Sequence, residues 1–342
     1  MSVAIEQISS SSAPPSLDPH PATPSLHPGS EPVAKIDSRH FDLFEVPVEI
    51  SAPLAGETVV AGEPYVLKDT SGRVLCMNLT GRVDWEWAFV GQYASYPGNV
   101  LPISFSANPF TTNATVYADQ GKSKWKLYAN GSATSWEWLF WGDSGWQKPV
   151  LSVKASGTLQ SFKLRHSNGG VEMGVCADAG TWHWAYVGGS SYTPLDLSLH
   201  KFFVSRAKLV AALKKAWPKA SFSYLRTNDT EYEVIDNAKA VQIWNSSKLT
   251  NYTWKKDVFD CDDFSYVYKA EASRRAYDDN AVRSYAIGCV AATTSNGAHA
   301  ANLFVNYSGQ VRILEPQTGH VIDPETWTDK KGVKYEPYEV LL

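Results

Sequence analysis

The heptapeptide Trp85-Glu-Trp-Ala-Phe-Val-Gly91 decides the fold of the first half of the chain, because it occurs three times. It returns as Trp136-Glu-Trp-Leu-Phe-Trp-Gly142 and as Trp182-His-Trp-Ala-Tyr-Val-Gly188. Short strand-like runs broken by Gly, Asn, Asp and Pro surround each copy. Three all-β units of this length suit a β-trefoil, whereas a propeller needs at least about four blades. We therefore expect an all-β β-trefoil domain over residues 48–203.

The repeated tryptophans have two readings. On a strand the first and third residues of the heptapeptide share one face, so they can form a core or a platform for a sugar ring. An aromatic repeated in all three units is more often core. Trp125, Trp141 and Trp146 break the repeat pattern. We therefore expect those three to be the exposed carbohydrate-binding residues.

Composition excludes several classes of function. The formal net charge is −4. The chain therefore lacks the excess of basic residues that would predict nucleic acid as a partner. No apolar run approaches the ~20 residues that a transmembrane helix needs. The N-terminus has neither the basic nor the apolar region of a signal peptide, which predicts a cytoplasmic or non-classically secreted protein. Residues 1–47 are rich in Ser and Pro and are expected to be a disordered tail and linker.

The second half has a different pattern. The run Ala207-Lys-Leu-Val-Ala-Ala-Leu-Lys-Lys-Ala-Trp217 is typical of an amphipathic helix that Pro218 stops. A second helix is expected from Cys261 to about Ala276, followed by three strand-like runs that start at residues 284, 298 and 311. Helices followed by an antiparallel sheet predict an α+β domain. We place that domain at residues 204–342.

The segment Asp260-Cys-Asp-Asp-Phe264 puts a thiol on the first turn of a helix. Unpaired backbone N–H groups and the helix dipole favour the thiolate there. A cysteine nucleophile also needs a base and a group that orients the base. His299 starts one later strand and Glu315 ends the next, so the two can be cross-strand neighbours. Cysteine on a helix, then histidine and acid on a sheet, is the papain-like order.

The acids around the thiol act against this chemistry. Asp260, Asp262 and Asp263 disfavour a thiolate by like-charge repulsion. A divalent cation would reverse the local field, and carboxylates three residues apart on a helix suit calcium. The pattern predicts a nucleophile that is inactive until metal binds.

Each of these residues also has a structural reading. An isolated cysteine is usually a small buried hydrophobe, and an isolated histidine is usually a structural one. An acid cluster is more often a solvated helix end than a metal site. Four scattered cysteines, without a CxxC pair, predict neither a disulfide framework nor a zinc site.

A resemblance favours the catalytic reading. Residues 232–319 resemble the C-terminal domain of the fungal chimerolectin family in the segments VQIWNSSKL, TWKKDVFDCDDF, NGAHAANLF and ILEPQTG. That family joins a glycan-binding β-trefoil to a calcium-dependent, papain-like protease domain that also forms a homodimer. The resemblance implies Cys261 as nucleophile, His299 as base and Glu315 as the third member.

The resemblance also implies a metal site and a substrate cleft. It makes Asp260, Asp263 and Gln317 contributors to metal binding, and it places Trp254 beside the cleft. Thr318 stands where the family has Asn, which puts one metal contact in doubt. The N-terminal lobes carry WxWxxxG in place of the family's QxW signature, so the family's sugar specificity does not transfer.

The resulting expectation is a two-domain protein, a β-trefoil followed by an α+β papain-like cysteine peptidase domain. Its function would be that of a lectin fused to a protease activated by calcium or manganese, acting as a defence toxin on a cell-surface glycan and a protein substrate. One alternative is a lectin with a non-catalytic dimerisation domain. The other is a transglutaminase-like acyl transferase, which differs only in the acceptor.

Overall fold

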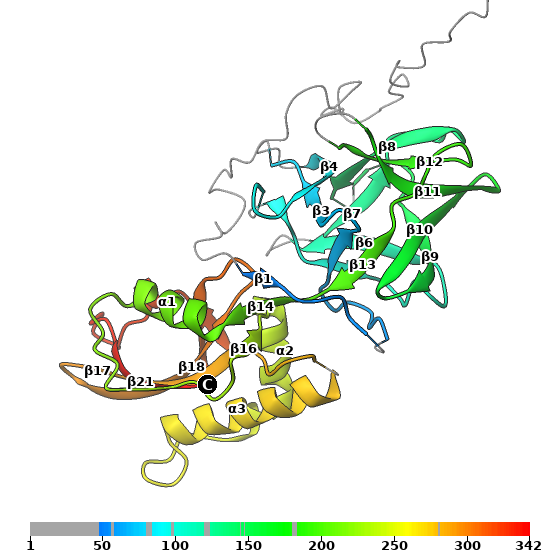
Figure 1. Cartoon of the computed structure of the whole chain (residues 1–342). Helices are drawn as coiled ribbons and strands as arrows, with labels where there is room; N and C mark the ends of the chain where they lie inside the picture. Colours follow the sequence, from blue (N-terminus) through cyan, green and yellow to red (C-terminus); the bar gives the residue numbers. More distant parts are fainter. Residues whose placement is uncertain are drawn as a thin grey trace, which may run out of the picture.

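The computed structural model describes most of the chain after residue 47. The described residues are 48–55, 58–79, 84–96, 99–119, 124–143, 145–146, 148–179, 183–279 and 281–342. The tail expected over residues 1–47 lies outside them, as does Trp182 of the third heptapeptide. Figure 1 shows a barrel of strands in one half of the molecule and the three labelled helices in the other.

The barrel is a 12-stranded sheet that closes on itself. Its main path runs β11-β12-β8-β4-β3-β2-β13-β10-β9-β6-β5, β11 also pairs with β10, and β7 joins β6 to β8. The strands are β2 (Val66–Asp69), β3 (Arg73–Met77), β4 (Trp85–Gln92), β5 (Ile103–Phe105), β6 (Ala114–Asp119), β7 (Lys124–Ala129), β8 (Trp136–Gly142), β9 (Ser152–Thr158), β10 (Ser161–Asn168), β11 (Val171–Ala177), β12 (Ala185–Gly188) and β13 (Leu197–His200).

The three heptapeptides lie on neighbouring strands of this barrel. Glu86 of β4 lies opposite Trp141 of β8, and Trp138 of β8 lies opposite Tyr186 of β12. An isolated bridge between Phe89 and Trp184 links the first copy to the third. The described tryptophans at the first and third positions are buried, except Trp136, which is partly buried. The repeat is therefore core, as its regularity indicates.

The three tryptophans expected to bind sugar are buried as well. Trp125, Trp141 and Trp146 are 4%, 1% and 5% exposed, so the prediction of exposed stacking surfaces is wrong. Two of their indole nitrogens have backbone partners. Trp141 Nε1 donates to the Cys76 carbonyl at 3.2 Å, and Trp146 Nε1 donates to the Asp84 carbonyl at 2.9 Å. A buried indole whose N–H is bonded in this way carries little desolvation penalty.

The C-terminal half is built on a six-stranded sheet with the order β15-β21-β17-β18-β19-β20. Only β15 and β21 pair in parallel. Helix α3 packs on β17 and β18, and α2 packs on α3. The elements are α1 (Arg206–Ala216), β15 (Tyr224–Arg226), α2 (Asn237–Ser247), η2 (Leu249–Asn251), α3 (Cys261–Asp278), β17 (Ile287–Thr294), β18 (Gly297–Val305), β19 (Val311–Glu315), β20 (His320–Ile322), η3 (Pro324–Thr326) and β21 (Glu336–Leu341).

Local sequence explains these helices. In α1 the buried residues Leu209, Ala212 and Leu213 recur at helical spacing, and two lysines occupy its last turn, where the dipole favours them. Asp260 and Asp263 form a capping box at the start of α3. The predicted helices at 207–217 and from Cys261 are confirmed, and so is the hairpin turn between β17 and β18.

The fold class expected from the sequence is wrong. Sheets of 12, 3 and 6 strands carry the described part of the chain, and only three α-helices accompany them there. This is a nearly all-β fold, and no papain-like α+β domain is present among the described residues. The prediction failed because the order of cysteine, histidine and glutamate specifies a site, and the same site can be carried by unrelated folds.

A three-stranded sheet joins the two halves. Its order is β1-β14-β16, with β1 (Glu49–Ile50), β14 (Phe202–Ser205) and β16 (Glu231–Glu233). The domain boundary expected between residues 203 and 204 falls inside β14. One cluster of buried apolar side chains also runs from Trp85 of the barrel to Val290 of the six-stranded sheet.

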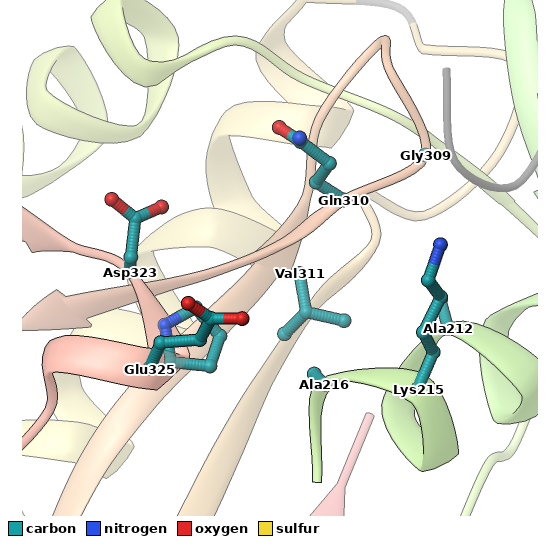
Figure 2. A pocket seen from close by; sticks show the side chains of 9 residues that line it. Ala212, Lys215, Ala216, Gly309, Gln310, Val311, Asp323 and Glu325 are labelled. Atoms are coloured by element: carbon teal, nitrogen blue, oxygen red, sulfur yellow. The ribbon is translucent and has the colours of Figure 1, made fainter. Parts of the chain in front are cut away.

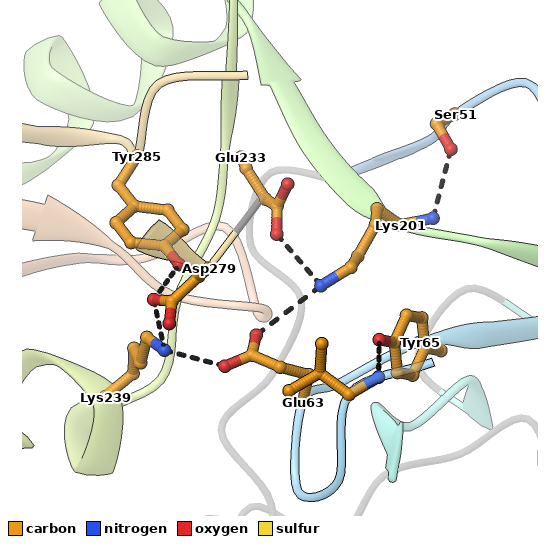
Figure 3. A network of polar contacts seen from close by, with 9 residues as sticks. Ser51, Glu63, Tyr65, Lys201, Glu233, Lys239, Asp279 and Tyr285 are labelled. Carbon is orange, nitrogen blue, oxygen red and sulfur yellow. Dashed lines mark hydrogen bonds and ion pairs between the residues drawn. The ribbon is translucent and has the colours of Figure 1, made fainter. Parts of the chain in front are cut away.

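A buried network of charges lies at the same junction (Figure 3). Glu63 of the barrel bonds both Lys201, at 3.5 Å, and Lys239 of α2, at 2.6 Å. Lys201 also pairs with Glu233 at 3.2 Å, and Lys239 pairs with Asp279 at 2.7 Å. Positive and negative groups alternate along the network, so each lysine lies between two carboxylates. Breaking any one of these ion pairs would leave a buried charge without a partner, so the network favours a single arrangement of the two halves.

Candidate functional site

The three residues predicted as catalytic come from three elements that the fold brings together. Cys261 is the first residue of α3, His299 lies near the start of β18, and Glu315 ends β19. Because α3 packs on β18, the N-terminus of the helix lies over the strand that carries the histidine. Burial raises the pKa of the Cys261 thiol, and the backbone N–H of Ala300, the residue after His299, acts against that rise. The thiol therefore lies beside β18 at the residue that follows His299.

His299 and Glu315 form the central contact. Nε2 of His299 lies 2.7 Å from Oε2 of Glu315, and each side chain is 17% exposed. The backbone N–H of Gln317 donates to Oε1 of the same carboxylate at 3.2 Å. Nδ1 makes no hydrogen bond that the described residues show. The tautomer that fits this contact carries its proton on Nε2, which donates to Glu315, and has its lone pair on Nδ1.

The register differs from the simple expectation. The ladder between β18 and β19 ends with Asn302 opposite Leu314, so His299 does not lie directly opposite Glu315. The two side chains meet diagonally, two residues apart along the ladder, which is within reach of long side chains on one sheet face.

Nearby acids oppose ionisation of the Cys261 thiol. After burial, the charges of Asp260 and Asp262 raise the pKa of the Cys261 thiol further. The other three cysteines, Cys76, Cys176 and Cys289, are buried, whereas Cys261 is partly exposed. Burial raises the pKa of Cys176 to about 11. Among the four, only Cys261 combines access with a base.

Asp260, Cys261 and Asp262 form a compact ligand group, with one atom of each lying within 4.8 Å of the others. The two carboxyl groups share a hydrogen bond, which lowers the pKa of Asp260 and raises that of Asp262. Two carboxyl oxygens held this close fit a hard divalent cation such as calcium. The structure thus groups Asp260 with Asp262, which the prediction had left out of the ligand set.

The other predicted ligands have different contacts. Oδ2 of Asp263 accepts the backbone N–H of Asp260 at 3.0 Å, so this carboxylate caps the helix. Gln317 contributes its backbone N–H to Glu315, and no contact of its side chain with the aspartates is described. Their roles as metal ligands stay predictions.

Trp254 lies in the loop that leads to the nucleophile. It is 49% exposed, and Tyr252 beside it stacks on Phe259 with ring centroids 4.9 Å apart. Lys255 and Phe259 exchange backbone hydrogen bonds at 2.9 Å, so the loop is held as a short hairpin. An exposed indole this close in sequence to the thiol can contact a substrate, but no contact with Cys261 itself is described.

Two aromatic residues at the site were missed. The rings of Trp327 and Tyr335 lie 6.3 and 5.5 Å from the His299 imidazole, measured between centroids. They stand in the segment Trp327-Thr-Asp-Lys-Lys-Gly-Val-Lys-Tyr335. Its Lys- and Gly-containing centre is typical of a surface turn, and nothing in its pattern connects it to a histidine 28 or more residues earlier. A turn signal at Asp329 to Gly332 would have predicted a hairpin at most.

A separate hollow of about 270 Å³ lies elsewhere in the C-terminal half (Figure 2). It lies between α1, the turn before β19 and η3, and its lining includes Lys215, Gln310, Asp323 and Glu325. None of the three predicted catalytic residues lines it. Asp323, one of its acids, already pairs with Arg312. We therefore take the surroundings of Cys261 as the candidate site.

The described residues include no helix that is both long and apolar enough to span a membrane. Comparison with known proteins gives one family match: residues 232–321 match the family described as Agglutinin C-terminal. The resemblance found from the sequence is confirmed for that segment. No curated protein matched the chain.

Several solved structures are similar at low identity. One is described as a PSL1a-E64 complex, with 20% identity, 83% of this chain and 100% of that chain covered, and a TM-score of 0.41. Another is Polyporus squamosus lectin bound to the epitope Neu5Acα2-6Galβ1-4GlcNAc, with the same identity and coverage and a TM-score of 0.40. A Kunitz-type trypsin inhibitor from Cicer arietinum is 14% identical, covers 44% of this chain and 98% of its own, and has a TM-score of 0.33.

Proposed function

We propose that this chain, whose residues 232–321 match the agglutinin C-terminal family, is a glycan-binding lectin that also carries a metal-activated cysteine endopeptidase site. The family match supports the lectin part of the proposal. The endopeptidase part depends on the site around Cys261. Its main support is the 2.7 Å contact between His299 and Glu315 beside a thiol at a helix N-terminus.

The proposed reaction assigns one role to each of the three residues. Sγ of Cys261 attacks the carbonyl carbon of a peptide bond while Nδ1 of His299 takes the thiol proton. The C–N bond then breaks, and the same imidazole gives that proton to the leaving amine. A water molecule, deprotonated by His299, attacks the resulting thioester and releases the acid and the free thiol. Glu315 holds the tautomer and stabilises the imidazolium that forms in each half of the cycle.

Asp260 and Asp262 would hold a divalent cation, calcium or manganese, which would supply positive charge beside the thiol. In its absence the negative charge of Asp260 and Asp262 disfavours the thiolate, so the thiol keeps its proton. Activity should therefore require the cation.

The decisive experiment compares two cysteine variants of the full chain. Cys261→Ala should lose at least about 1,000-fold of the casein-cleaving activity measured with millimolar calcium. Cys289→Ala is the matched control because Cys289 is a buried thiol on β17 and should retain activity. Wild-type cleavage by the Cys261→Ala variant would contradict the assignment. If the wild-type chain itself cleaves nothing while still binding glycan, the C-terminal half is non-catalytic.

A further inference from the structure

A short hairpin covers the imidazole of His299, and we name residues 327–335 the clasp. Trp327 and Tyr335 stand at its two ends, and their ring centroids are 4.7 Å apart. Tyr335 is the closer to His299, at 5.5 Å with an angle of 36° between the ring planes. Trp327 is almost completely buried, so it forms a fixed backing for the tyrosine.

The clasp is internally rigid. The N–H of Tyr335 donates to the Trp327 carbonyl at 3.1 Å, and Thr328 bridges to Lys334. At the tip, Oδ1 of Asp329 accepts the backbone N–H groups of Lys331 and Val333 at 2.8 and 3.0 Å. These bonds hold both ends of the hairpin side by side and so keep the two rings next to each other.

The clasp is also tied to the strand that carries the base. Oδ2 of Asp329 accepts hydrogen bonds from Oγ1 of Thr294 at 2.9 Å and from Nδ2 of Asn296 at 2.7 Å. Both donors lie at the turn that leads into β18, a few residues before His299. The hydrogen bond from Asn296 and the other donors lower the pKa of Asp329 to about 2, so this carboxylate stays charged at all ordinary pH values.

His299 needs such support. Its one described hydrogen bond, to Glu315, fixes the position of Nε2 but leaves the imidazole free to tilt about that contact. The distance from Nδ1 to the reacting thiol depends on the tilt, and a displacement of about 1 Å can reduce turnover ~100-fold. A flat ring packed against the imidazole removes that freedom.

The hydroxyl of Tyr335 has a different character from its ring. Burial raises the pKa of the phenol, and the charges of Asp329, Glu315 and Cys261 raise it further, so the group is neutral at physiological pH. The described residues show no hydrogen bond to this hydroxyl. The packing of the ring is therefore the contact that the structure assigns to Tyr335.

We propose that Tyr335, backed by Trp327, is a positioning residue whose ring holds the His299 imidazole so that Nε2 bonds Glu315 and Nδ1 is presented to Cys261. The consequence for turnover rests on the proposed endopeptidase function. The consequence for the tautomer and orientation of His299 does not.

The test compares three variants of the full chain. Tyr335→Leu removes the ring, Tyr335→Phe keeps it, and Tyr338→Leu is the matched control because Tyr338 is an exposed tyrosine on β21. With calcium, Tyr335→Leu should lower kcat for a peptide substrate roughly 10- to 100-fold with little change in KM. Tyr335→Phe should restore kcat to within about threefold of wild type, and Tyr338→Leu should match wild type.

A second measurement does not need turnover. Long-range proton–nitrogen correlation spectra of the ¹⁵N-histidine-labelled protein report which ring nitrogen of His299 carries the proton. The wild type and Tyr335→Phe should show one tautomer, protonated at Nε2, and Tyr335→Leu should show a mixture. If Tyr335→Leu does not fold, Asp329→Asn, which weakens the tie to Thr294 and Asn296, should produce the same mixture with both rings still present.

The outcomes separate the two proposals. Wild-type kcat and a single tautomer in Tyr335→Leu would overturn the positioning role. Equal losses in the Phe and Leu variants would also overturn it, because the hydroxyl would then be the active part. A wild-type protein that cleaves nothing, with a tautomer mixture only in Tyr335→Leu, would support the positioning role and refute the endopeptidase.

Discussion

The charged network at the junction and the acid cluster at Cys261 are built in opposite ways. In the network, Lys201 and Lys239 alternate with three carboxylates, so each positive group lies between two negative ones. At the nucleophile the acids Asp260, Asp262 and Asp263 have one sign only. No lysine or arginine of the described ranges forms an ion pair with any of the three.

The difference shows what each cluster requires. An alternating network satisfies its own charges, so it can be buried and can serve as structure. A cluster of one sign beside a titratable thiol has no such internal compensation, and in our proposal a bound cation supplies it. Mutations in the network should therefore change the stability of the protein. Added cations should change both the stability of the protein and the reactivity of the Cys261 thiol.

The largest effect on stability should come from breaking the network at its most buried lysine. Lys201→Met leaves Glu233 buried without its partner, which should lower the free energy of unfolding by about 3–5 kcal/mol. Urea denaturation monitored by tryptophan fluorescence measures this change. Arg165→Met is the control because the Arg165–Glu172 pair is exposed and should contribute less than ~1 kcal/mol. Equal losses in the two variants would show that the network has no special role.

Calcium should give the next largest effect. At 100 times its dissociation constant, a cation bound only by the folded state stabilises it by about 2.7 kcal/mol. We expect calcium to raise the melting temperature of the wild type and to accelerate alkylation of Cys261 by iodoacetamide. Asp262→Asn should reduce both responses, and Asp257→Asn, outside the cluster, should keep them. Identical curves in calcium and in chelator would leave the aspartates as a solvated helix end.

Two carboxylates of the network should give opposite dependences on pH. Burial raises the pKa of Glu233 more than Lys201 lowers it, so its contribution to stability is complete below about pH 4.5 and is lost as pH rises through its folded pKa. Burial alone would raise the pKa of Asp279. Hydrogen bonds from Lys239 and Tyr285 have the larger combined effect, so the pKa is lowered. Its contribution is complete above about pH 3.8 and is lost as pH falls through its folded pKa.

Single variants isolate the pH dependence of stability that each carboxylate contributes. Glu233→Gln should remove the loss of stability on raising the pH above 4.5, and Asp279→Asn should remove the loss on lowering it below 3.8. The sign of each change is read from urea midpoints between pH 3 and pH 8. Slopes of the same sign for the two residues would contradict the opposite directions of their pKa shifts.

The smallest effect on stability is expected at Trp254. Its indole is half exposed, so Trp254→Ala should change the free energy of unfolding by no more than about 0.5 kcal/mol. If the proposed endopeptidase site is correct, the KM for a peptide substrate should nevertheless rise, because the exposed indole lies on the loop that leads to Cys261. Tyr277→Ala, at an exposed tyrosine near the other end of α3, should change neither quantity. An unchanged KM in Trp254→Ala would place substrate binding elsewhere.

The features of this molecule that depend on local sequence patterns could be predicted from the sequence. The threefold heptapeptide predicted three related strands and their buried faces, and the spacing of Leu209 and Leu213 predicted α1. Cys261, His299 and Glu315 could be chosen because each follows a helix or strand signal, and the fold does bring the last two into contact.

The remaining features depend on contacts between distant segments. Trp141 and Trp146 look irregular in the repeat, but their indoles bond carbonyls of β3 and of the residue before β4, which no local pattern reveals. Tyr335 reaches His299 only because Asp329 ties the clasp to the turn before β18. The fold class was wrong for a related reason: a set of chemically suitable residues does not identify the scaffold that carries them.

The sheet β1-β14-β16 has a consequence for how this protein can be rearranged. The chain reaches the barrel through β1 and leaves it through β14, and these two strands pair with each other, Glu49 with Phe203 and Ile50 with Phe202. The whole barrel is thus an insertion between two neighbouring strands that stay on the C-terminal half. A cut inside β14 would expose two strand edges and favour aggregation. Exchange of the segment between Ile50 and Phe202 for another barrel with adjacent ends would keep that sheet intact.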